Sequence, residues 1–160
     1  EEHLIMSETG REQFVAGKNF LKEDNFDRAL KAFEKAYKAD GENPAYMSYF
    51  GMCKALRAGE IGLGLELCTR AIKKEFFRAE YYLNLGKVYN AAGNKKGAIK
   101  VYLKGLKFEP ENEEINRRLL ELGFRSKPVI RSLDRNNPVN KFLGIFFRKT
   151  LPGLFGRGRG

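Results

Sequence analysis

Few residues in this 160-residue sequence have the chemistry of a catalytic or metal-binding site. The one histidine is His3, near the first residue, and neither Cys53 nor Cys68 has a cysteine or histidine close by in the sequence with which to hold a metal. No glycine-rich phosphate-binding or dinucleotide-binding pattern occurs. We therefore expect no enzyme activity, no metal and no cofactor, and we expect both cysteines to be small buried thiols.

Positive charge is the other chemical signal, and it is concentrated near the end of the chain. The segment from Gly123 to Gly160 has nine Lys or Arg residues and one Asp, so it carries +8 of the net charge of +10. Basic and aromatic side chains that could contact a membrane or a partner alternate within it: Lys141, Phe142, Ile145, Phe146, Phe147, Arg148 and Lys149.

Three interpretations of this tail, residues 124–160, remain open. Its apolar residues could pack on the preceding helices or on a second copy of the chain. Alternatively, a short helix near residues 138–150, starting at Asn137-Pro138, could lie on an anionic membrane surface. The ending Arg157-Gly158-Arg159-Gly160 is short for a nucleic-acid-binding arm, so nucleic acid is the least favoured partner.

Small residues recur at a nearly constant interval through the rest of the chain. Three series have spacings of 34 and 35 residues in either order: Gly17, Gly51 and Gly86; Ala29, Gly64 and Ala98; Ala36, Ala71 and Gly105. Taken together, these intervals place one additional residue in the middle repeat, near Ala58 and Gly59. A period of about 34 residues is typical of a stack of helical hairpins.

The clearest repeat, Ala79 to Asn112, identifies the kind of hairpin. Its small, aromatic and proline residues have the offsets of two packed antiparallel helices: Tyr82, Leu85, Gly86, Tyr89, Ala98, Tyr102 and Pro110. The pattern resembles the tetratricopeptide repeat family. The resemblance implies an all-α, right-handed solenoid of three hairpins (residues 10–43, 44–78 and 79–112) between an N-terminal segment (1–9) and a capping helix (113–123) that precedes the tail.

Capping residues predict where several of these helices begin and end. Thr9 with Glu12 fits a capping box at the start of the first helix, and Asn43 and Asn112 are expected caps of later helices. Gly123 is expected to end the capping helix in the left-handed conformation.

Two glycines lie within a helical stretch of the middle hairpin, at positions 62 and 64. Gly64 occupies the place of Ala29 and Ala98 in the other repeats, so we expect two helices to approach closely there. Gly62 has no such counterpart and is interpreted as a fraying helix start.

The family resemblance also implies a binding site, because the first helix of each hairpin lines an inner groove where family members hold peptides. Alignment with the repeats gives these candidate groove residues: Arg11, Phe14, Lys18 and Leu21; Ala45, Ser48, Met52 and Ala55; Glu80, Leu83, Lys87 and Asn90. We hypothesise a protein or peptide partner with apolar anchors and some acidic character, contacting Met52 between Phe14 and Leu83. The alternative is that these residues are only the exposed face of structural helices.

One ligand class is not expected. Family members that grip the C-terminal carboxylate of chaperones use Lys, Asn and Arg at five positions, which correspond here to Phe14, Lys18, Tyr49, Glu80 and Asn84. None of the five matches, and Glu80 would repel a carboxylate.

Two functions therefore remain as hypotheses. The first is a protein-interaction module or adaptor that binds a peptide in the groove. The second is a peripheral membrane protein, or as a less favoured variant a nucleic-acid-binding one, that uses the tail and has the repeats as a spacer. With no run of about 18 apolar residues and an acidic start, we expect a cytoplasmic protein, peripheral at the inner face of the membrane if the tail binds lipid.

Overall fold

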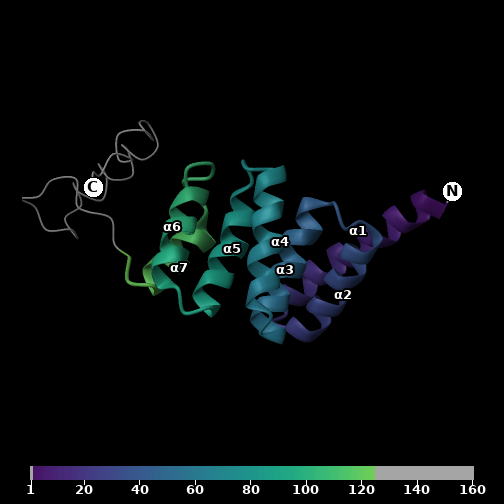
Figure 1. The fold of residues 1–160 in the computed structure, drawn as a ribbon, viewed down its shortest axis with the longest axis horizontal. Coiled ribbons are helices and arrows are strands. Elements are labelled where there is room, and N and C mark those ends of the chain that lie inside the picture. Colours follow the sequence, from purple (N-terminus) through teal and green to yellow (C-terminus); the bar gives the residue numbers. More distant parts are fainter. Residues whose placement is uncertain (1, 125–160) are drawn as a thin grey trace, which may run out of the picture.

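The computed structural model describes residues 2–124, with side chains from Thr9 onward, and it confirms the predicted all-α fold over this range (Figure 1). These residues form seven helices and no strand: α1 (Glu2–Lys22), α2 (Phe26–Ala39), α3 (Pro44–Ala58), α4 (Ile61–Lys74), α5 (Ala79–Ala91), α6 (Lys95–Gly105) and α7 (Glu113–Glu121). The predicted helix near residues 138–150 and every predicted tail contact lie outside the described residues.

Consecutive helices pair as hairpins, and the hairpins follow one another in a row (Figure 1). Helix α1 packs on α2, α3 on α4 and α5 on α6, while α3 and α4 also contact α5. The pairing follows from one-sided hydrophobic faces, as in α2, where Ala29, Ala32, Phe33 and Ala36 are buried at helical spacing. The last helix, α7, covers the end of the row with Ile115 and Leu119.

The recurring small residues mark the places where helices approach most closely. A Cβ atom built on Gly17 would lie 2.6 Å from Cε1 of Phe33, and one built on Gly86 would overlap the ring of Tyr102. In the middle hairpin, a Cβ on Gly64 would lie 2.7 Å from both the Cβ of Ala55 and the carbonyl oxygen of Gly51. The predicted close approach at Gly64 is therefore confirmed.

Helix caps agree with the prediction at Asn43 and Asn112 but not at Thr9. The side chain of Asn43 accepts hydrogen bonds from the backbone N–H groups of Ala45 and Tyr46, and Asn112 accepts one from Ile115. The capping box at Thr9 is wrong, because α1 begins at Glu2 and Thr9 lies within it. The neighbouring Gly10 has a packing role instead, since a Cβ there would lie 3.0 Å from the Cβ of Ala39.

Removing the cap at Asn43 should have a measurable effect on stability. We expect Asn43→Ala to lower the free energy of unfolding by about 1 kcal/mol, because two backbone donors at the start of α3 lose their acceptor. The matched control is Glu60→Ala, since Glu60 precedes α4 without a side-chain cap. Its effect should stay within about 0.5 kcal/mol, and equal losses in urea denaturation would contradict the capping role.

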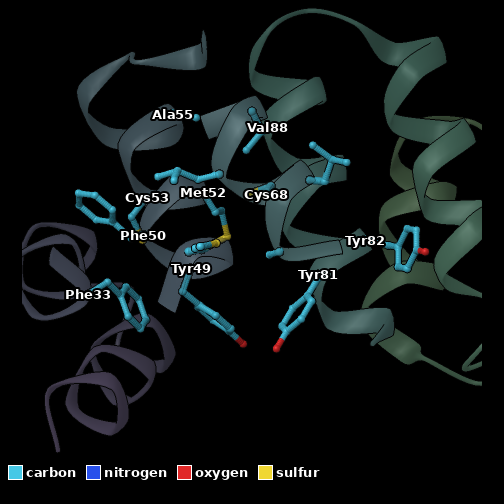
Figure 2. Close-up of a cluster of buried hydrophobic side chains, with 14 of the residues drawn as sticks. Phe33, Tyr49, Phe50, Met52, Cys53, Ala55, Cys68, Tyr81, Tyr82 and Val88 are labelled. Carbon is cyan, nitrogen blue, oxygen red and sulfur yellow. The ribbon is translucent and has the colours of Figure 1, made fainter. Parts of the chain in front are cut away.

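Buried hydrophobic residues form a smaller cluster among α5, α6 and α7 and a larger one that is centred on α3. Figure 2 shows Cys53, Met52 and Cys68 inside it, with the hydroxyl ends of Tyr49 and Tyr81 pointing toward the same edge. Both cysteines are free and buried, as predicted, and burial raises the pKa of each thiol to about 12. Neither thiol is therefore a thiolate nucleophile near neutral pH.

Candidate functional site

Side chains from the first helix of each hairpin meet on one face of the molecule. We call this the first-helix face and define it by Phe14, Lys18, Tyr49, Glu80 and Lys87. Helix α1 reaches α3 through the ring of Phe14, which lies 5.2 Å from that of Tyr49. Helices α3 and α5 pack directly on each other.

A single carboxylate joins three helices at the centre of this face. The ammonium group of Lys18 lies 3.2 Å from Oε1 of Glu80, and the hydroxyl of Tyr49 donates a hydrogen bond to the same oxygen. Lys18 Nζ also lies 5.6 Å from the ring centroid of Tyr49. Burial, together with Glu80, raises the pKa of Tyr49, so its hydroxyl remains a neutral donor. The charge of Lys18 is thus compensated within the molecule.

A second ion-pair network connects α5 with α7. Lys87 lies 3.6 Å from Glu114, which also pairs with Arg118 at 3.1 Å and with Arg117. Burial lowers the pKa of Lys87 although Glu114 opposes the shift. Burial acts to raise the pKa of Glu114, but Arg117, Lys87 and Arg118 outweigh it and the net shift is downward. Glu121 also pairs with both arginines, so this network has three cations and two carboxylates. This end of the face therefore has an excess of positive charge.

Polar groups beneath the surface are satisfied by one another. The amide of Asn84 donates a hydrogen bond of 3.0 Å to the hydroxyl of Ser48, and both residues are buried. Among the described residues, no buried side-chain nitrogen or oxygen lacks a partner. This Ser48–Asn84 contact ties α3 to α5 and leaves nothing buried for a ligand to complete.

The predicted groove residues divide into accessible and buried sets. Arg11 and Asn90 are exposed, and the half-buried residues are Phe14, Lys18, Leu21, Ala45, Glu80, Leu83 and Lys87. By contrast, Ser48, Met52 and Ala55 are only 0%, 1% and 3% exposed. The expectation that Met52 forms an accessible groove floor is therefore corrected.

The position of α3 explains this correction. It is the middle first helix, paired with α4 and in contact with α2 and α5. Ser48 turns to Asn84 of α5, and Ala55 lies against Gly64 of α4. The accessible part of the face consequently runs along α1 and α5, with α3 recessed between them.

Sequence reasoning also missed the contribution of α7, whose Glu114, Arg117 and Arg118 join the face through Lys87. A signal for it exists in the sequence. The residues that precede α3, α5 and α7 are Asn43, Arg78 and Asn112, which are 35 and 34 residues apart. That spacing gives α7 the position of a fourth first helix.

Neither a metal-binding cluster nor a membrane-spanning helix occurs in the part of the chain that the structure describes. There is no group of three or more His, Cys, Asp or Glu side chains able to hold a metal ion. None of the helices in this range has both the length and the apolar content needed to cross a bilayer.

Comparison with known proteins agrees with the fold. Family models described as tetratricopeptide repeat match residues 14–53 and residues 79–112. This chain belongs to the tetratricopeptide repeat family. A curated relative, U-box domain-containing protein 70 of Oryza sativa subsp. japonica, is 28% identical over 99 residues, which are 62% of this chain and 12% of that protein. The tetratricopeptide repeat chain therefore spans only a small part of the length of that relative.

Solved structures with the same fold have low sequence identity to this chain. The first tetratricopeptide repeat domain of Spaghetti (RPAP3), bound to the HSP90 peptide SRMEEVD, is 21% identical with a TM-score of 0.59, over 73% of this chain and 94% of that one. The corresponding domain of Arabidopsis OM64 is 19% identical with a TM-score of 0.61, over 74% and 97%. YrrB, a repeat protein with an unusual peptide-binding site, is 19% identical with a TM-score of 0.56, over 69% and 56%.

Proposed function

We propose that this tetratricopeptide repeat protein is a non-enzymatic interaction module that binds a peptide segment of a partner protein on the first-helix face. The observation that carries the proposal is the set of half-buried apolar and cationic side chains that α1 and α5 present on either side of α3: Phe14, Lys18, Leu21, Leu83 and Lys87. Proteins of the same fold support it, since Spaghetti and the second such domain of human RPAP3 are seen with bound peptides.

The chemistry of the face suggests which peptide would bind. Phe14 and Leu83 offer apolar contacts at the two sides of the recessed helix. Arg11 is exposed and has no ion pair among residues 9–124, and Lys87 competes with two arginines for Glu114. A peptide with apolar anchors and one or two acidic side chains would complement this surface.

A C-terminal carboxylate is a poorer ligand for the same face. The peptides SRMEEVD and SGPTIEEVD, seen with Spaghetti and RPAP3, both end in Glu-Glu-Val-Asp. In this chain Glu80 already forms an ion pair with Lys18 and accepts a hydrogen bond from Tyr49. It would repel a second carboxylate brought to these groups. We therefore propose that the bound segment is internal to the partner.

The test begins with a peptide selected by the full chain from a displayed random library. Leu83→Glu combined with Lys87→Glu should raise the Kd of that peptide at least about tenfold, because an apolar contact is lost and the charge is reversed. Far-ultraviolet circular dichroism verifies that the variant is folded.

The matched control combines Leu103→Glu with Lys73→Glu, since both residues are exposed on second helices, α6 and α4. SRMEEVD serves as a competitor and should displace the selected peptide poorly. An unchanged Kd in the Leu83 and Lys87 variant, with loss in the control, would place binding elsewhere.

A further inference from the structure

Three phenylalanines form an exposed cluster at one end of the second and third hairpins. We call Phe76, Phe77 and Phe108 the aromatic tip. Phe76 and Phe77 lie in the turn between α4 and α5, and Phe108 lies in the turn between α6 and α7. Their exposed fractions are 62%, 56% and 42%. Three large apolar side chains exposed together are the usual mark of an interaction site.

The folded structure holds these rings in place. Ring centroids lie 5.9 Å apart between Phe76 and Phe77, and 5.9 Å apart between Phe76 and Phe108. The buried ring of Tyr82 stacks on Phe108 at 5.6 Å, and its hydroxyl donates a hydrogen bond of 2.8 Å to the carbonyl oxygen of Phe76. The two turns are thus joined to each other and to α5, so the exposure is a property of the fold.

Uncompensated charge around the aromatic tip is positive. Lys73 and Lys104 lie in the last turns of α4 and α6, Lys107 adjoins Phe108, and none of the three has an ion pair within residues 9–124. Of the nearby carboxylates, Glu75 pairs with Arg78. Glu109 accepts a hydrogen bond from the neutral amide of Asn112 and keeps its charge, so the three lysines outnumber it. Favourable interaction with helix C-termini explains lysines at Lys73 and Lys104, but not the phenylalanines beside them.

We propose that the aromatic tip is a peripheral docking site for an anionic lipid bilayer. The rings protrude from two turns, so they suit a soft surface into which they can insert, while the three lysines face acidic headgroups. A second copy of the tip, or the basic tail of this chain, would bring positive charge against positive charge. The site shares no residue with the first-helix face and does not depend on the proposed peptide binding.

Vesicle flotation with the full chain tests this proposal. The probes are vesicles of phosphatidylcholine alone and vesicles of phosphatidylcholine with phosphatidylserine, at low and high salt. Binding is expected only to the anionic vesicles and should weaken at high salt. Phe76→Ser with Phe77→Ser should reduce the bound fraction about tenfold, and Lys104→Gln with Lys107→Gln should reduce it on anionic vesicles.

Two controls separate the aromatic tip from the other apolar surfaces of the chain. Val15→Ser with Leu56→Ser removes apolar groups that are exposed elsewhere and should leave binding unchanged. Phe146→Ser with Phe147→Ser tests the tail. The proposal is overturned if the wild type binds no vesicles, if only the tail variant loses binding, or if Phe76→Ser with Phe77→Ser binds as the wild type does. It is also overturned if Phe76→Ser with Phe77→Ser abolishes binding to a protein partner but leaves vesicle binding unchanged.

Discussion

Gly64→Ala is expected to lower the free energy of unfolding by about 1–3 kcal/mol, although alanine is the better helix former. The new methyl group would lie 2.7 Å from the backbone oxygen of Gly51 and 2.7 Å from the Cβ of Ala55. Neither atom belongs to a flexible side chain that could turn away. Relief therefore requires α3 and α4 to separate, which would loosen the core centred on them.

The control for Gly64→Ala lies two residues earlier on the same helix. A Cβ on Gly62 has nothing within 4 Å, so Gly62→Ala should stabilise the protein by up to about 1 kcal/mol through helix propensity alone. Urea denaturation of both variants measures the two effects. Opposite signs are expected, and a stabilising effect of Gly64→Ala would show that helix propensity, not close packing, governs this position.

Met52→Glu is expected to unfold the domain or to cost at least about 4 kcal/mol of stability. The side chain of Met52 is 1% exposed and belongs to the hydrophobic core cluster around α3. A carboxylate there would lose its hydration without gaining a partner. The prediction follows from the burial of Met52, which belongs to the core and does not form an accessible groove floor.

Leu83→Glu is the informative comparison because Leu83 is half-buried on the first-helix face. We expect it to cost about 1 kcal/mol, since the carboxylate can reach water. Circular dichroism and denaturation distinguish the variants. A folded Met52→Glu protein with near wild-type stability would mean that α3 opens to solvent, and the division between accessible and buried groove residues would fail.

The repeat and its packing could be predicted from the sequence because both depend on small residues at fixed intervals. Gly17 and Gly86 each accommodate an aromatic ring sixteen residues later, Phe33 and Tyr102, so the close contact within a hairpin is recorded in the residue types themselves. The caps at Asn43 and Asn112 are similarly local, because one side chain satisfies the backbone of its own helix. Thr9 is not a cap because α1 begins at Glu2 and continues past Thr9. The next residue, Gly10, packs against the second helix.

The accessible part of the site could not be derived by alignment because accessibility depends on neighbours. Every residue of α3 from Tyr46 to Cys53 is buried, so no face of that stretch remains for a ligand. The sequence does hold a signal for this, since the segment is apolar on all sides, which is typical of a central helix. The Lys18–Glu80–Tyr49 contact joins residues 62 and 31 positions apart, and no local pattern encodes such pairs.

The most direct test of the proposed function is to map where a peptide binds. The measurement is a titration of the isotope-labelled full chain with the library-selected peptide, followed by backbone and methyl chemical shifts. We expect saturable shifts at Phe14, Lys18, Leu83 and Lys87, with little change at Phe76 or Phe108. Shifts confined to the aromatic tip, or to residues outside the first-helix face, would contradict peptide binding on that face.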